Sequence, residues 1–118
     1  LETDLAEDEM LTEIRVPKLP DAKWSFQKFN RRAQDWAIVG ASIICDDSHV
    51  GVGLVNMHST PFRSEAVEAA LSNGANAEDA AELAAENTEA PTDLNASKGY
   101  REHLARVLVK RGLQEAGR

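Results

Sequence analysis

The segment from Ile38 to Cys45 constrains the fold of this chain more than any other, because every residue in it is apolar or small. A run that can be covered on both faces is typical of a central β-strand. Asp46–Ser48 predicts a hairpin turn, and Val50–Met57 the returning strand. Alternating patterns predict two more strands at Met10–Val16 and Lys23–Phe29. Four strands joined by short connections indicate an antiparallel sheet.

The second half of the chain carries helical patterns instead. Ser64 is expected to cap a first helix that ends at Asn73-Gly74, and Asn76 to cap a second. Asn95 or Ser97 is expected to begin the last helix. The apolar face of that helix is expected to comprise Tyr100, Leu104, Val107 and Leu108. Strands followed by helices predict an α+β fold, with an antiparallel sheet of three to four strands in the first half packed against about three helices in the second half.

Composition excludes several classes of protein. The chain has 118 residues, which suits one compact domain. Its formal net charge of −7 argues against a nucleic-acid partner, because binding to a phosphate backbone needs a basic field. No apolar run approaches the ~20 residues that span a bilayer, and the N-terminus lacks a secretory signal pattern. The single Cys45 cannot form an internal disulfide, which favours a cytoplasmic setting.

The charge is unevenly distributed along the chain. The first nine residues are rich in aspartate and glutamate, whereas the segment after Ser97 is rich in lysine and arginine. A solvated acidic tail and a solvated helix face explain this pattern. The alternative is a charged docking surface for a larger partner.

No catalytic or metal site can be assembled from the sequence. His49, His58 and His103 are isolated and there is no second cysteine, so no metal site is predicted. Cys45 ends an apolar strand, where a thiol is desolvated and inert, so we expect a buried structural residue. The Gly51–Gly53 segment precedes no helix and is therefore not a dinucleotide-binding motif.

The charged segment from Lys28 to Trp36 is the candidate functional element. Its candidate binding residues are Lys28, Arg31, Arg32, Asp35 and Trp36. One interpretation is a plain connection between strands, in which the charges pair with each other or with water. The other is a border around a flat, electron-rich ligand. In that case the cationic side chains hydrogen-bond carbonyls or a pyrophosphate, the aromatic side chain shields a ring, and Asp35 orients the arginines.

Four segments of the chain resemble one family in the same order. They are Leu11–Pro17, Phe26–Ala37, Asn56–Arg63 and Asp93–Leu108. The second contains the pattern Lys-Phe-x-Arg-Arg-x-x-Asp-x-Ala, and the third contains Asn-Met-x-x-Thr-Pro-x-Arg. Together they resemble the C-terminal domain of the FAD-binding (medium) flavoprotein subunit of molybdenum hydroxylases, of the aerobic carbon monoxide dehydrogenase type.

This resemblance implies a domain organisation and a role. Residues 1–9 resemble the tail of a preceding FAD-binding subdomain, and residues 10–118 the C-terminal domain. The implied role is to support the flavin that passes electrons from iron–sulfur clusters to an external acceptor. The resemblance places the loop from Lys28 to Asp35 near the flavin edge. The alternative is a free-standing, non-enzymatic protein-interaction module with the same fold.

The resemblance also implies cofactors and partners. FAD is expected in the full-length parent subunit, but this chain alone is not expected to retain it, because the glycine-rich loops that grip the pyrophosphate are missing. The implied partners are the preceding FAD-binding subdomains, an iron–sulfur small subunit with [2Fe–2S] clusters, and a large subunit with the molybdenum cofactor. No catalytic residue is expected in this domain.

Overall fold

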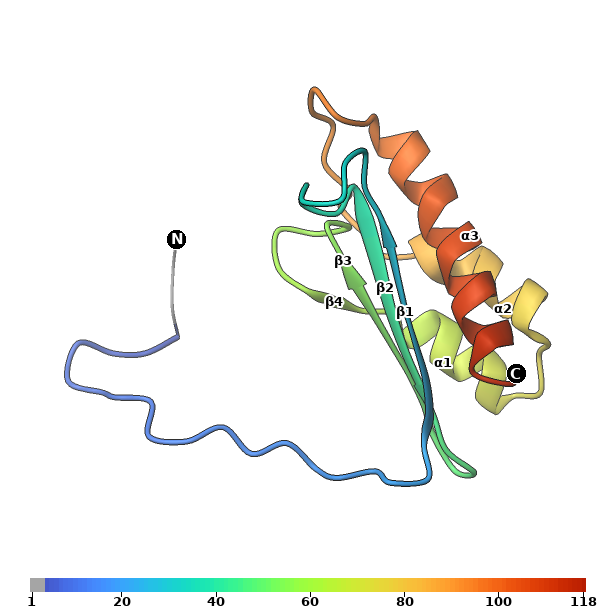
Figure 1. The fold of residues 1–118 in the computed structure, drawn as a ribbon, viewed down its shortest axis with the longest axis horizontal. Coiled ribbons are helices and arrows are strands. Elements are labelled where there is room, and N and C mark those ends of the chain that lie inside the picture. The colour runs from blue at the N-terminus through green and yellow to red at the C-terminus, as the bar shows by residue number, and fades with distance from the viewer. Residues whose placement is uncertain (1–3) are drawn as a thin grey trace.

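The computed structural model describes residues 4–118 and shows helices packed on one face of an antiparallel sheet (Figure 1). The strands are β1 (Lys23–Phe29), β2 (Val39–Cys45), β3 (Val50–Val55) and the short β4 (Phe62–Arg63), in the spatial order β1-β2-β3-β4. The helices are α1 (Glu65–Ser72), α2 (Ala77–Glu82) and α3 (Lys98–Glu115), and a 3₁₀ turn η1 (Leu83–Ala85) follows α2. This arrangement confirms the predicted α+β class.

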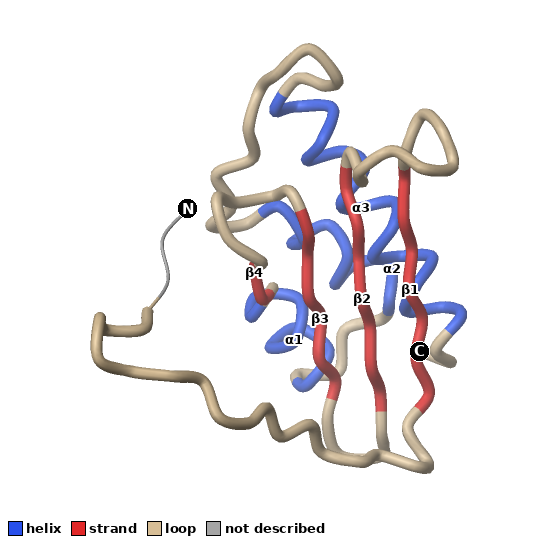
Figure 2. The backbone as a smooth tube through the Cα atoms, turned by 60° about the vertical axis from the view of Figure 1, so that its left-hand side comes forward, coloured by secondary structure: helices blue, strands red, loops and turns tan. Residues whose placement is uncertain are grey.

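Alternation along the strands decides which side chains meet the helices. In β2, Val39, Ala41, Ile43 and Cys45 are buried, whereas Ser42 and Ile44 face the other side of the sheet. The cysteine is therefore the buried residue that its position predicts. Helix α3 packs on β1 and β2, while α1 packs on β3, so that all the helices lie behind the sheet in Figure 2. The core is this single layer between sheet and helices.

Helix α3 is fixed to the sheet near its C-terminal end. A side chain at Gly112 would collide with Cδ1 of Ile43, so glycine permits the close approach of α3 to β2. Glycine in a helix interior costs about 1 kcal/mol relative to alanine, which close packing must offset. Next to this contact, the Glu115 carboxylate accepts hydrogen bonds from Ser25 Oγ at 2.6 Å and Gln27 Nε2 at 2.7 Å.

The predicted strand at Met10–Val16 is wrong. This segment belongs to an extended arm that precedes β1, and Met10, Ile14 and Val16 are between 77% and 80% exposed. A strand needs a sheet edge for its backbone hydrogen bonds, and within residues 4–118 no edge pairs with the arm. The fourth strand is β4, which pairs with β3. The first three residues of the expected 1–9 tail lie outside the described residues.

The expected helix boundaries are mostly confirmed. Helix α1 ends at Asn73 and Gly74, where Gly74 adopts the left-handed φ of 90° that favours glycine. Asn76 caps α2 by accepting the Asp79 N–H at 2.9 Å. Ser97, rather than Asn95, caps α3. Ser64 precedes α1 as predicted, but its buried hydroxyl makes no capping hydrogen bond.

The buried face of α3 differs from the predicted face. Leu104 and Leu108 are buried as expected, but Tyr100 is 44% exposed and Val107 is only half-buried. The buried face comprises Arg101, Leu104, Ala105, Leu108, Val109, Gly112 and Leu113. These positions follow the i, i+3, i+4 spacing of one helix face. The face therefore begins with a charged residue, which the apolar pattern did not include.

Truncation of Leu104 tests this packing. Leu104→Ala should lower the free energy of unfolding by about 2–5 kcal/mol, because it removes buried apolar atoms and leaves a cavity under the sheet. Val107→Ala, on the half-buried side of the same helix, is the matched control and should cost much less. The measurement is urea unfolding followed by circular dichroism. Equal decreases in unfolding free energy for the two variants would contradict the observed orientation of α3, which buries Leu104 and leaves Val107 half-exposed.

Candidate functional site

The loop between β1 and β2, residues 30–38, is a compact turn. Its base is closed by the Ile38 N–H, which donates to the Phe29 carbonyl at 2.7 Å. Inside it, the Asp35 N–H donates to the Arg32 carbonyl at 3.0 Å, and this carbonyl also accepts from the side-chain amide of Asn30. The backbone of the β1–β2 loop is thus internally hydrogen-bonded, which leaves its charged side chains free to face outward.

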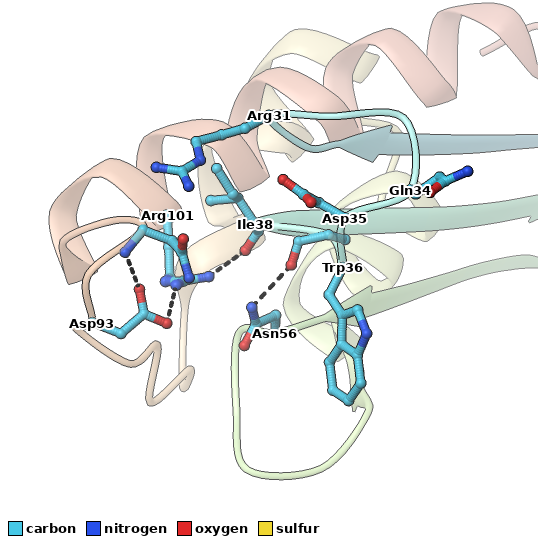
Figure 3. A pocket seen from close by; sticks show the side chains of 10 residues that line it. Arg31, Gln34, Asp35, Trp36, Ile38, Asn56, Asp93 and Arg101 are labelled. Carbon is cyan, nitrogen blue, oxygen red and sulfur yellow. Dashed lines mark hydrogen bonds and ion pairs between the residues drawn. The ribbon is translucent and has the colours of Figure 1, made fainter.

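Arg101 of α3 connects this loop to the helical layer. Its side chain is fully buried, with 0% exposure. Nη1 donates to the Ile38 carbonyl, and Nη2 donates to Asp93 Oδ2 at 2.7 Å (Figure 3). A buried arginine needs such partners, because an unpaired charge away from water is very unfavourable. The two contacts join the end of the loop to the segment that enters α3.

Asp93 is itself held in a turn. Its Oδ1 accepts the backbone N–H groups of Asn95 at 2.8 Å and Ala96 at 3.1 Å. These two backbone hydrogen bonds are the main reason that the pKa of Asp93 lies below its usual value. Desolvation opposes them, and the hydrogen bond and charge of Arg101 lower the pKa by smaller amounts. Asp93 is therefore a carboxylate at neutral pH and a stable counter-ion for the buried guanidinium.

Asn56 secures the loop from a third side. It follows β3 in the left-handed conformation with a φ of 63°, which asparagine tolerates better than most residues. Its Nδ2 donates to the Ala37 carbonyl at 3.0 Å. The end of the β1–β2 loop is thus held by β1, by the turn after β3 and by α3.

These elements surround a pocket of about 490 Å³. It is lined by Arg31, Gln34, Asp35, Trp36, Ala37, Ile38, Asn56, Asp93, Asn95 and Arg101. This volume falls within the range of small-molecule sites. The residues that line it include no serine, cysteine or histidine to act as a nucleophile or base. The charged and amide side chains of the lining can hydrogen-bond a polar ligand.

The structure brings together some of the predicted site residues but not all. Arg31, Asp35 and the 93%-exposed Trp36 line the pocket, whereas Lys28 and Arg32 do not. Lys28 is exposed on β1 opposite Gly40, on the sheet face away from the helices. In the part of the chain that the structure describes, no hydrogen bond or ion pair joins the Asp35 carboxylate to either arginine, so the contacts do not provide the orienting role expected for it.

Three supporting residues were not predicted: Asn56, Asp93 and Arg101. The signal for Arg101 was its phase, because an arginine at the i−3 position from Leu104 lies on the buried stripe of α3. Such an arginine must find a partner inside the protein. Asn56 begins the Asn-Met-x-x-Thr-Pro-x-Arg pattern, but that pattern does not indicate its contact with the Ala37 carbonyl, which depends on how the chain folds.

Metal binding and membrane insertion are the other properties of the described residues that bear on function. Within residues 4–118 no group of three histidine, cysteine, aspartate or glutamate side chains is placed to hold a metal ion. No helix in that range is both long and apolar enough to cross a membrane.

Fold and site together define a class of protein: an α+β domain with a ligand-sized pocket beside its β1–β2 loop. The family model of the CO dehydrogenase flavoprotein C-terminal domain matches residues 24–116. The chain belongs to this family, which confirms the resemblance seen in its sequence.

Individual relatives agree with this assignment. The carbon monoxide dehydrogenase medium chain of Hydrogenophaga pseudoflava is 31% identical over 97% of this chain and 43% of its own length. The nicotine 6-hydroxylase medium subunit of Paenarthrobacter nicotinovorans is 26% identical over 98% of this chain and 44% of its own. A solved structure of carbon monoxide dehydrogenase from Hydrogenophaga pseudoflava superposes with a TM-score of 0.77 and 30% identity, over 84% of this chain and 38% of that one. The chain spans less than half the length of these relatives.

Replacement of Arg101 tests its role at the loop. Arg101→Met should lower the free energy of unfolding by about 1–3 kcal/mol, because the buried Ile38 carbonyl loses its donor. Backbone amides of residues 31–37 should also exchange faster with solvent. Lys110→Met is the control on the same helix, since its ion pair with Glu78 is exposed and lies outside the pocket. Unchanged loop exchange in Arg101→Met would show that the contact does not hold the loop.

The lowered pKa of Asp93 predicts a pH dependence. A carboxyl whose pKa is depressed in the folded state adds stability above its unfolded pKa, near 3.8, and loses it as pH falls through the lower folded pKa. Asp93→Asn should therefore melt at a lower temperature than the wild type at neutral pH, and the gap should narrow in strong acid. Thermal unfolding from about pH 7 to about pH 2 measures this. A difference in melting temperature that stays constant with pH would exclude the ionised carboxylate as its cause.

Proposed function

We propose that this chain is the C-terminal domain of the FAD-binding medium subunit of a molybdenum hydroxylase of the carbon monoxide dehydrogenase type. Residues 10–118 form this domain, and residues 1–9 are the end of a preceding FAD-binding subdomain. The observation that carries the proposal is the family match over residues 24–116, which includes the whole β1–β2 loop and the segments that hold it.

The residues present fit the edge of a flavin but not the whole of FAD. Arg31 offers a planar set of donors, and Trp36 offers an exposed aromatic surface beside the pocket. By contrast, no described helix is preceded by a glycine-rich loop of the kind that cradles a pyrophosphate. We therefore assign the grip on the cofactor to the preceding subdomains, and a supporting role to this domain.

In this proposal Lys28, Arg31, Arg32, Asp35 and Trp36 provide the environment at the flavin edge. FAD, when bound, supplies the electron transfer from iron–sulfur clusters to an external acceptor. The chain's own contribution is electrostatic and steric: cations on a firmly held loop, and an aromatic side chain that excludes water. The firm attachment of the loop through Arg101 and Asn56 supports this, because a fixed charge acts on its neighbour more strongly than a mobile one.

The remaining partners follow from the same assignment. We propose an iron–sulfur small subunit with [2Fe–2S] clusters and a molybdenum-containing large subunit as assembly partners. The relatives' names as medium chain and medium subunit support this. The cytoplasmic location expected from the lone Cys45 stays a prediction.

Removal of the loop cations tests the electrostatic role. In the complete flavoprotein subunit, Arg31→Ala and Arg32→Ala should each shift the flavin midpoint potential to more negative values, because a nearby cation favours the more negatively charged reduced flavin. The corresponding change in the free energy of flavin reduction should be on the order of 1 kcal/mol. It should decrease as salt is added, since both arginines are exposed. Asp35→Asn removes a negative charge and should shift the potential in the opposite direction.

Two controls distinguish an electrostatic effect of these substitutions from a loss of folding stability. Urea unfolding of each variant should match the wild type, because no hydrogen bond of the loop base is removed. Lys110→Ala removes a cation on α3 outside the pocket and should leave the potential unchanged. If all three loop variants kept the wild-type potential, the loop would be a plain connection between strands.

Because we assign the grip on FAD to the preceding subdomains, we expect this chain alone to bind flavin weakly. Titration of the 118-residue chain with FAD, followed by flavin fluorescence, should show no stoichiometric complex at micromolar concentrations. The physical reason is the missing cradle for the pyrophosphate. A tight one-to-one complex would show instead that the pocket beside the β1–β2 loop holds the cofactor by itself.

A further inference from the structure

One face of the sheet is left open. Its side chains alternate with the buried ones: Trp24 lies opposite Ile44, Phe26 opposite Ser42, and Lys28 opposite Gly40. Val55 continues the last of these rows onto β3. All helices lie on the other side of the sheet in Figure 1 and Figure 2, and no described helix covers this one. We call this surface the open face.

The open face is more apolar than a solvated surface requires. Trp24 is 70% exposed and Phe26 56%, and these two side chains are neighbours on the same side of the edge strand β1. Ile44 and Val55 are 36% and 44% exposed on the same face. Clustered aromatic side chains of this kind are typical anchors of protein interfaces, which bury them in the centre of the contact.

Gly53 keeps the middle of this face flat. A Cβ at Gly53, in the middle row, would approach only Ser42 O, at 3.9 Å, and one at Gly40, a buried residue of the end row, would meet Val55 Cβ at 3.5 Å, which are ordinary contacts. Neither glycine has a positive φ. The packing of this chain therefore does not require them, although glycine weakens a strand interior. A half-buried strand glycine such as Gly53 permits close approach by a ligand or another backbone.

The course of the chain indicates what covers the face. The arm of residues 4–20 leaves β1 and extends on the side of the sheet opposite the helices (Figure 1). The matching family is a C-terminal domain, and this chain spans 43% of the Hydrogenophaga pseudoflava medium chain. In such a relative the rest of the polypeptide precedes the C-terminal domain, and the arm is the segment of this chain on that side of β1.

We propose that the open face is the surface through which this domain docks onto the part of the flavoprotein subunit that precedes it. Trp24 and Phe26 are the anchors, and the half-buried Gly53 allows close approach. This inference rests on the proposed function, because it takes the chain to be the C-terminal domain of such a subunit. It goes further by assigning the sheet surface, which the flavin role leaves unexplained.

Side-chain accessibility is the first test. Hydroxyl-radical labelling of Trp24 and Phe26 should be at least about tenfold slower in the complete subunit than in the 118-residue chain, because the centre of an interface excludes water. Tyr100, which is 44% exposed on α3, is the internal control and should react equally in both. Equal labelling of Trp24 in the two proteins would overturn the proposal.

A matched pair of substitutions is the second test. Gly53→Glu places a charged side chain in the middle of the open face, and Gly99→Glu places the same side chain on α3, where nothing lies within 4 Å of its Cβ. Both variants of the 118-residue chain should keep the wild-type melting temperature to within about 5 °C. In the complete subunit, a protease site introduced into the arm allows the domain to dissociate after cleavage. Gly53→Glu should then raise the dissociation constant between the cleaved domain and the rest of the subunit by about 30-fold or more, and Gly99→Glu should not.

The outcomes are distinct from those of the flavin proposal. A subunit that binds FAD normally but labels freely at Trp24 would overturn docking alone. A subunit with a protected Trp24 and no response of the flavin to the loop variants would overturn the flavin role alone. If the isolated chain formed a concentration-dependent dimer that protects Trp24, the open face would be an interface between copies, which would also overturn the proposal.

Discussion

The packing of α3 against β1 and β2 is the interaction on which the rest of the structure depends. Leu104, Leu108 and Leu113 bury their side chains in it, and each truncation of such a residue costs about 2–5 kcal/mol. Polar contacts also hold both ends of the helix, one to the β1–β2 loop and the other to β1. Arg101 donates to the Ile38 carbonyl at one end, and Glu115 accepts from Ser25 at the other. The helix that completes the core therefore also fixes the β1–β2 loop.

The two faces of the sheet differ in what they contact. The face toward the helices supplies stability, because its side chains are buried against α1 and α3. The open face carries exposed aromatic residues that contribute nothing to that core. The β1–β2 loop lies where the strands end, between these two surfaces. A domain built in this way has a rigid side that holds a charged loop in place and a second side that is available to a partner.

The sequence predicted much of the fold but less of the candidate site. The β2 and β3 strands, the Asn76 cap and the glycine end of α1 were predicted, because each follows from a short local pattern. The strand expected at Met10–Val16 failed, since pairing requires an edge that residues 4–118 do not offer it. Arg31, Asp35 and Trp36 were found together at the pocket, but Asn56, Asp93 and Arg101, which hold its walls, were not foreseen as such.

The amino-acid sequence by itself determined the class of fold, the order of strands before helices, and the charged loop between β1 and β2. These features depend on periodicity, capping and turn residues, which act over a few positions. The tertiary structure decided which face of α3 is buried, that Arg101 reaches Ile38 across 63 residues, and that one face of the sheet remains open. Such outcomes depend on how distant segments pack, and packing is settled by the whole set of buried contacts rather than by any local pattern.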